Sequence, residues 1–229
     1  MMPSYDDKLP PILWFWIPLG TILFQLIGER FIYQDYMAWV VGENGPYELV
    51  QFIVITLALI LAVRILVGMD RSDKYMTTWI ALAAVCCFYV SGEEISWAQH
   101  FAKWNTPEYW ASFNDQNETN LHNTSSWLDQ KPRLLLSIGV YVGGIIIPLL
   151  LKYKPSFVPS SLAQIYPTRA FIVTASICVL IRSLDIYGDV TNIHVFGRSA
   201  ENEELFLFYF VFLYLLLMKK RLIPAKKQG

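Results

Sequence analysis

Six stretches of the sequence are apolar over about the length that a helix needs to cross a membrane, roughly 20 residues. They lie at 11–28, 47–68, 75–95, 134–151, 168–187 and 203–218. Hydrophobic residues make up 55% of the 229-residue chain and charged residues only 16%, which is too apolar for a soluble domain of this size. The sequence therefore predicts an all-α, polytopic membrane helix bundle that forms one integral membrane domain over 1–229.

Charge is distributed unevenly between the loops on the two sides of this predicted bundle. Short loops rich in Lys and Arg remain on the cytoplasmic side of a membrane. If both termini are cytoplasmic, that side holds Lys8, Arg64, Arg71, Lys74, Lys152, Lys154, Arg169, Lys219, Lys220, Arg221, Lys226 and Lys227. Most acidic residues then lie on the outer side, where only a few basic residues, including Lys131 and Arg133, oppose the assignment. We expect a multi-pass protein of a cell membrane, the bacterial inner membrane, with both termini cytoplasmic.

The predicted outer loop at 100–132 is unusually aromatic for a solvated linker, with Trp104, Tyr109 and Trp110 in its first half. Amphipathic aromatic side chains favour the membrane–water interface. Thr106-Pro107-Glu108 is typical of a helix start, which predicts a short interfacial helix at about 107–114. The loop is a candidate contact surface for a protein partner, in addition to membrane lipids. The sequence has no basic nucleic-acid-binding patch, so we expect no nucleic-acid partner.

Two adjacent acids, Glu93 and Glu94, end the third apolar stretch. On a helix that begins near Tyr75, Glu93 lies about 27 Å along, near the outer edge of a hydrocarbon core roughly 30 Å thick. A continuous helix places Glu93, Trp97 and His100 on one face and turns Glu94 about 100° away. The acids are either membrane-edge residues or part of a reactive site, and Glu94 needs a different partner from Glu93.

Other spans carry ionisable residues toward the same predicted membrane face. Arg182 in the fifth span needs an acid, which is either Asp185 at i+3 or Glu93 or Glu94 from a neighbouring helix. An ion pair that only fixes packing is an equal alternative. Glu204 is the deepest acid at the start of the last span and the one expected to face the bundle interior, whereas Glu201 and Glu203 fit an ordinary helix start.

These residues suggest acid/base chemistry at the outer face, or a divalent metal site. The candidate catalytic residues are Glu93, Glu94, His122, Asp185 and Glu204. The candidate substrate-binding or structural polar residues are Trp97, Gln99, Glu108, Asn120, Asn123, Arg182 and Glu48. The candidate metal ligands are His122, Glu93 and His194, although the histidines follow no compact metal motif. The cofactor therefore stays undetermined, with a divalent metal as one alternative.

The stretch 92–99, GEEISWAQ, followed by Thr106-Pro107-Glu108 and Asn120-Leu121-His122-Asn123, resembles a pattern in a family of bacterial multi-pass membrane proteins without an assigned activity. The family pattern has a glycine before the glutamine and a basic residue after it, where this chain has Ala98 and His100. The resemblance therefore adds nothing for His100 and names no reaction. It implies that the following residues act as a unit: Glu93, Glu94, Trp97, Gln99, Glu108, Asn120, His122 and Asn123.

Three functions remain open from the sequence. The first is a membrane-embedded enzyme that acts on a lipid or lipid-linked substrate, because acids gather with His122 at an aromatic interface. The second is a non-catalytic accessory or scaffold subunit whose outer loop binds a partner. The third is a small transporter or channel, because ionisable residues within spans often line ion pathways.

Overall fold

The computed structural model describes residues 7–32, 36, 39–40, 45–112, 120–121 and 126–223, with the backbone alone at 100–101 and 126–130. These residues form helices and turns and no strand. Five helices are long and apolar enough to cross a membrane: Ile12–Phe31, Pro46–Gly68, Lys74–Glu93, Lys131–Tyr153 and Arg169–Thr191. The predicted all-α membrane helix bundle is therefore confirmed.

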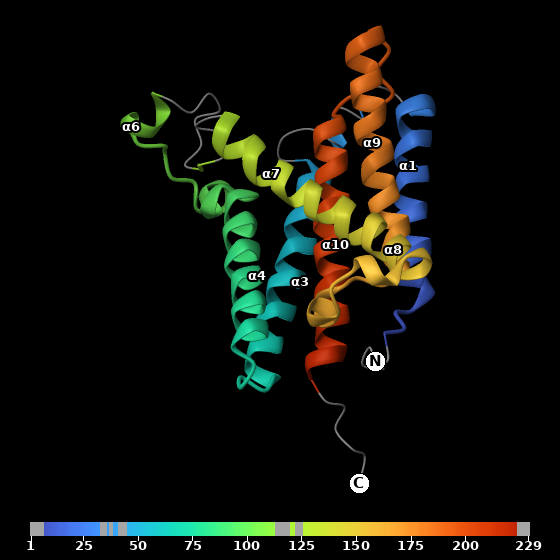
Figure 1. Ribbon diagram of the computed structural model, residues 1–229. Helices are drawn as coiled ribbons and strands as arrows, with labels where there is room; N and C mark the ends of the chain where they lie inside the picture. The colour runs from blue at the N-terminus through green and yellow to red at the C-terminus, as the bar shows by residue number, and fades with distance from the viewer. Residues whose placement is uncertain are drawn as a thin grey trace.

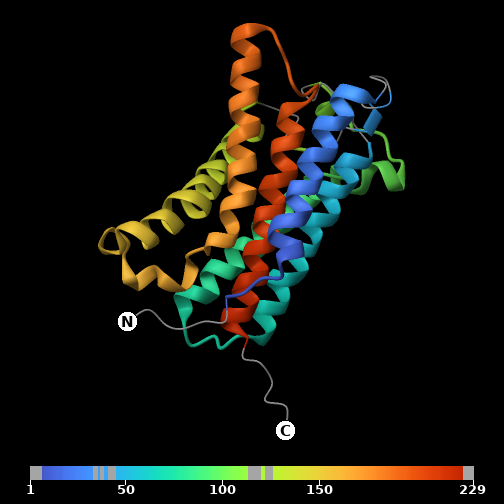
Figure 2. The same ribbon diagram turned by 90° about the vertical axis from the view of Figure 1, so that its right-hand side faces the viewer.

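The long helices run up and down the bundle in chain order (Figures 1 and 2). A π-helical turn at Ile12–Trp16 leads into α1, and a second at Val142–Ile146 joins α7 to α8. The helices are α1 (Ile17–Phe31), α3 (Pro46–Gly68), α4 (Lys74–Glu93), α5 (Gln99–Ala102), α6 (Glu108–Ala111), α7 (Ser126–Tyr141), α8 (Ile147–Tyr153), α9 (Ile172–Thr191) and α10 (Ser199–Leu222).

Helix α10 contains the sixth predicted span and forms the centre of the bundle, between α3 and α9 (Figure 1). Most of its side chains from Leu205 to Met218 are buried. Charged residues lie at both of its ends, with Glu203 near the start and Arg221 near the end. The middle of α10 thus supplies much of the core, and its charged side chains lie toward the two ends of the bundle.

Close packing at the centre depends on Gly144, between α7 and α8. A Cβ atom at this position would lie 2.5 Å from the Ala175 Cβ and 2.7 Å from the Phe210 ring. Those distances are shorter than non-bonded carbon atoms allow. Glycine therefore lets this segment approach α9 and α10 closely.

The two ends of the bundle differ in charge. At what we call the basic end, the Arg221 guanidinium donates two hydrogen bonds to the Asp7 carboxylate, at 2.6 and 2.9 Å, and others to the carbonyls of Gln164 and Tyr166. The first and last described segments of the chain therefore meet at the same end of the bundle. The opposite, acidic end holds the ends of α1, α4 and α9 and the starts of α3, α7 and α10.

The predicted loop at 100–132 is partly helical. The short predicted helix is confirmed as α6, Glu108–Ala111, and its position in a membrane interface stays a prediction. Helix α7 begins at Ser126 rather than at 134, with Pro132 inside it. Arg133, at the end of this extension, pairs with Glu204 of α10, a contact that hydropathy alone does not indicate.

Candidate functional site

The end of α4 differs from the continuous helix expected from the sequence. The helix ends at Glu93, and Ser96, Trp97 and Ala98 all have positive φ angles, from 46 to 71°. The prediction that Glu93, Trp97 and His100 share one helical face is therefore wrong, because a left-handed turn separates them. The His100 side chain lies outside the described residues.

Trp97 nevertheless contacts Glu93, because the left-handed turn folds the indole back over the end of α4. The indole Nε1 donates to Glu93 Oε1 at 2.6 Å, and the backbone N–H of Leu121 donates to Glu93 Oε2 at 2.7 Å. The ring lies over Gly92, where a Cβ atom would be 2.8 Å from it. We call Gly92, Glu93, Trp97 and Leu121 the Glu93 clasp.

The clasp balances backbone strain against hydrogen bonding. A left-handed non-glycine residue costs about 1–2 kcal/mol, and three of them follow one another here. Hydrogen bonds to a charged group contribute about 1.5–3 kcal/mol each, and Glu93 accepts two. Summed over three residues, the backbone strain is similar in size to the free energy that the two hydrogen bonds contribute. The turn therefore depends on Glu93, which is buried at 4% exposure.

Other residues of the predicted unit support the same loop. Gln99 donates to the Thr106 hydroxyl at 2.8 Å, and Asn120 donates to the Ser96 hydroxyl at 3.1 Å. Glu108 lies exposed in the first turn of α6. His122 and Asn123 lie outside the described residues. Glu93, Trp97, Gln99 and Asn120 therefore take part in hydrogen bonds that join the end of α4 to the loop after it, whereas Glu94 and Glu108 take no part in these hydrogen bonds.

Glu94 faces a different environment, in which acids from other helices act on its carboxyl group. Burial raises the pKa of Glu94 well above its ordinary value, and the negative charges of Glu204, Glu201 and Glu48 raise it further. Arg133 acts in the opposite direction. Part of the Glu94 side chain remains exposed, but protein atoms crowd its carboxyl group. Glu94 therefore retains a proton at pH values where an exposed glutamate has lost it.

The charged groups around Glu94 come from three other helices. Arg133 of α7 pairs with Glu204 of α10, at 2.8 Å between Nε and Oε1. Arg198 pairs with Glu201 at 3.4 Å. We call this set the Glu94 cluster: Glu48, Glu94, Arg133, Glu201 and Glu204. A neutral carboxylic acid beside carboxylates and an arginine can donate or accept a proton, which is the requirement for general acid–base chemistry.

Three residues at this end make contacts that the sequence does not predict. In the sequence, Arg133 is an exception to the charge pattern, and Glu201 and Glu203 fit an ordinary helix start. Glu203 is buried and accepts hydrogen bonds from the Tyr141 hydroxyl at 2.6 Å and the Ser137 hydroxyl at 3.3 Å. The one available signal was the pair Arg133 and Ser137, which share a face at i, i+4 on the extended helix.

Arg182, Asp185 and His194 take part in contacts of their own. Arg182 pairs with Asp185 on α9 at 3.0 Å, and the arginine side chain is 54% exposed. Of the alternatives open from the sequence, the pair within one helix is therefore the one formed. His194 lies exposed after α9, beside Gly188. In the described part of the chain, no three His, Cys, Asp or Glu side chains are grouped to hold a metal ion.

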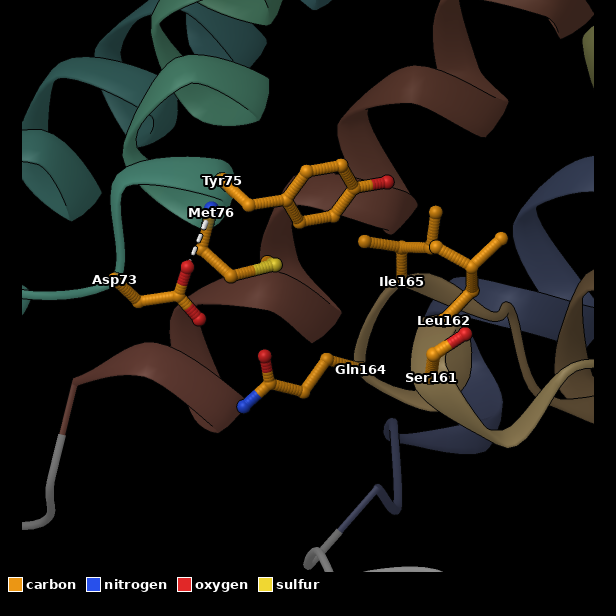
Figure 3. A pocket seen from close by; sticks show the side chains of 7 residues that line it. All are labelled: Asp73, Tyr75, Met76, Ser161, Leu162, Gln164 and Ile165. Carbon is orange, nitrogen blue, oxygen red and sulfur yellow. Dashed lines mark hydrogen bonds between the residues drawn. The ribbon is translucent and has the colours of Figure 1, made fainter.

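A cavity of about 330 Å³ lies at the basic end, between the start of α4 and the segment 161–165 (Figure 3). Its polar groups include Asp73, Ser161 and Gln164. Asp73 accepts a hydrogen bond from the backbone N–H of Met76, 3.1 Å away, and so caps α4. The acid of this cavity thus has a structural role, and the Glu94 cluster is the stronger candidate for chemistry.

Comparisons of the chain with protein-family models, with curated proteins and with solved structures give no match. The resemblance of the sequence to a family of membrane proteins therefore stays a prediction.

Proposed function

We propose that the protein is a membrane-embedded enzyme that acts on a lipid or lipid-linked substrate at the outer face of the membrane, with Glu94 as general acid and base. The observation that carries the proposal is the position of Glu94 beside Glu48, Glu201, Glu204 and Arg133, which raises its pKa. Carboxyl groups whose pKa is shifted by burial and by neighbouring charges are concentrated at active sites. The charge pattern of the loops supports the outer face.

In this proposal, protonated Glu94 donates its proton to the leaving oxygen of an ester bond in the substrate. The carboxylate formed then takes a proton from the attacking water or hydroxyl group, so the proton balance closes over one turnover. Arg133 lies close enough to stabilise negative charge that develops near Glu94. The Glu93 clasp positions Glu94 by fixing the end of α4.

The aromatic loop supports access from the bilayer. Trp97, Trp104 and Tyr109 are 37%, 41% and 74% exposed, and they lie on the segment that follows α4. Amphipathic aromatics at such a position lie among lipid head groups. In Figure 1 the segment with α6 extends beside the bundle, outside the packed helices.

The test is the lipid composition of cells in which the native gene is deleted and then restored as native protein, as Glu94→Gln or as Asp189→Asn. Asp189 is an exposed acid on α9 and serves as the matched control. We expect native protein and Asp189→Asn to restore a lipid species that Glu94→Gln does not, by mass spectrometry. Identical lipid profiles with native protein and Glu94→Gln contradict the proposal.

A second candidate is an accessory subunit that binds a protein partner through the loop at 100–132. The exposed Trp104 and Tyr109 side chains favour it, because aromatic residues are enriched in protein interfaces. Crosslinking from Tyr109 in native membranes separates the two candidates. A crosslinked protein supports the accessory role, and crosslinks to lipid alone support the enzyme.

A further inference from the structure

Two buried amide side chains lie where α3 meets the start of α10. Gln51 and Asn202 are both 0% exposed. Gln51 Nε2 donates to the Glu201 carbonyl at 2.9 Å, and Asn202 Nδ2 donates to the Arg198 carbonyl at 3.1 Å. Because only an NH₂ group can donate to a carbonyl, these contacts fix which end of each amide is oxygen.

The oxygens of these two amides have no hydrogen-bond donor among the described residues. A buried acceptor without a donor costs about 1–3 kcal/mol. Tyr47, one helical turn before Gln51, has a buried hydroxyl that is likewise without a partner among those residues and lies near Glu201. Helices α3 and α10 pack side by side (Figures 1 and 2). The oxygens of Tyr47, Gln51 and Asn202 lie along this seam without a hydrogen-bond partner among the described residues.

The seam adjoins the Glu94 cluster. The hydrogen bond from Gln51 ends on the main chain of Glu201, and Glu48 lies one helical turn from Gln51 on α3. Three glutamates and one arginine act on Glu94, so this region favours positive charge. It also reaches the surface, since the Arg133 and Glu204 side chains are 25% and 16% exposed.

We propose that the α3–α10 seam, with Gln51, Asn202 and the Glu94 cluster, binds the protonated primary amine of the substrate head group. The proposal rests on the proposed function and names the substrate class. An ammonium group has three donors and no acceptor, which matches a site made of acceptor oxygens and carboxylates. A phosphate or carboxylate group is repelled there by the glutamates, and the one arginine of the cluster already pairs with Glu204.

Binding of the amine couples to the proton on Glu94. A positive charge beside this carboxyl favours its ionised form, so bound amine lowers the raised pKa of Glu94 toward the range in which the group can both give up and take back a proton. The charged groups that face Glu94 are Glu48 on α3, Arg133 on α7, and Glu201 and Glu204 on α10. We therefore expect amine affinity to rise with pH, up to the pH at which the amine itself loses its charge.

The experiment measures the apparent melting temperature of the full chain in amine-free detergent with four probes: hexylamine, hexyltrimethylammonium, hexanol and hexanoate. We expect hexylamine to stabilise the protein most, hexyltrimethylammonium less because it has no N–H donor, and the other two not at all. Equal stabilisation by hexanol or hexanoate would overturn the proposal. Stabilisation by Zn²⁺ or Mn²⁺ without any by hexylamine indicates a metal site and also overturns it.

Variants test the named residues. Loss of one hydrogen bond to a charged group weakens binding about tenfold or more, so Gln51→Met is expected to bind hexylamine at least tenfold more weakly. Gln51→Glu keeps an acceptor and retains binding. Thr174→Val, which replaces a buried hydroxyl on α9, is the matched control and binds as the native protein does. If Gln51→Met and Thr174→Val bind hexylamine with equal affinity, the α3–α10 seam is not the amine site.

The two proposals fail separately. If the native protein binds the amine but Glu94→Gln gives the same lipid profile as the native protein, the proposed enzyme activity is wrong and the amine site stands. A lipid change that depends on Glu94, without amine selectivity, keeps the enzyme and removes this inference. If Gln51→Met does not fold, the affinity of Glu94→Gln for hexylamine tests the proposal instead. Glutamine cannot ionise, so the affinity of this variant is expected not to rise with pH.

Discussion

Glu93 and Glu94 are adjacent in the sequence and belong to two different regions of the structure. In the Glu93 clasp, both carboxylate oxygens accept hydrogen bonds from a loop that returns over α4. In the Glu94 cluster, the neighbours of the carboxyl group are mainly other acids. The first environment satisfies a charged carboxylate, and the second disfavours one.

This difference separates a structural role from a chemical one. A buried carboxylate whose oxygens already accept hydrogen bonds from the protein stabilises the fold and can form few further hydrogen bonds with a substrate. A carboxyl group among like charges retains a proton and can exchange it. Of the two acids, Glu93 therefore accounts for the conformation of the loop, and Glu94 is the residue to test for activity.

The largest effect on stability is expected from Glu93→Ala. It removes two charge-assisted hydrogen bonds that hold a strained turn, so we expect a loss of about 3 kcal/mol. Thermal unfolding in detergent is the measurement, with Glu94→Gln as the neighbouring variant. Equal melting temperatures for the two variants at pH 5 contradict the assignment of the clasp.

Gly92→Ala tests the clasp without changing a charge. Its Cβ atom would lie 2.8 Å from the Trp97 ring, so the ring has to move, at a cost of about 1–3 kcal/mol. Trp97→Ala removes the obstacle, so the two substitutions combined are expected to cost less than the sum of their separate effects. Additive losses in a double-mutant cycle show that the ring does not lie over Gly92.

Arg133→Gln tests the Glu94 cluster. It removes the partner of Glu204, at a cost of about 1–2 kcal/mol for a partly buried pair. It also removes the positive charge that lowers the pKa of Glu94, so Glu94 keeps its proton to higher pH. Infrared spectroscopy of the protonated carboxyl band during a pH titration measures this shift.

Arg182→Gln is the control for Arg133→Gln. Arg182 pairs with an acid of its own helix and is more exposed, so we expect a loss of about 0.5 kcal/mol or less. The carboxyl band of Glu94 should titrate as in the native protein. A similar shift in both variants means that Arg133 does not act on Glu94 specifically.

Glu94→Gln is expected to change stability least at acid pH. Because the pKa of Glu94 is raised in the folded protein, the folded state binds more protons than the unfolded state above the ordinary glutamate pKa of about 4.3. Stability therefore falls as the pH rises toward the raised pKa. Glutamine lacks this dependence, so melting curves from pH 4 to 8 should show the variant gaining stability relative to native protein. A constant difference contradicts the raised pKa.

Much of the fold could be predicted from sequence because the helices follow from local composition. A run of apolar residues such as 47–68 has to form backbone hydrogen bonds within itself, whatever surrounds it. The start of α7 could not be predicted in this way. It lies at Ser126, before the apolar run, and Arg133 in the added segment pairs with Glu204 of α10, a contact that leaves no trace in hydropathy.

The candidate site was predicted in part. Glu94, Glu48 and Glu204 were named from their places at span ends, and the structure brings them together with Glu201 and Arg133. Asp185 was named on the same grounds and pairs with Arg182 on its own helix instead. Position along a helix gives depth, whereas the direction of a side chain depends on which helices pack together.

The sequence by itself determined that this protein is a helical membrane bundle with acids gathered toward one end, because hydrophobic length and charge are local properties of the chain. Only the tertiary structure decided which of two adjacent glutamates lies among the charged groups of other helices. The left-handed turn at 96–98 returns Trp97 to Glu93, and the packing of α3, α7 and α10 surrounds Glu94 with charges from distant parts of the sequence. Environments of this kind arise from long-range contacts, and it is these that set the chemistry of a carboxyl group.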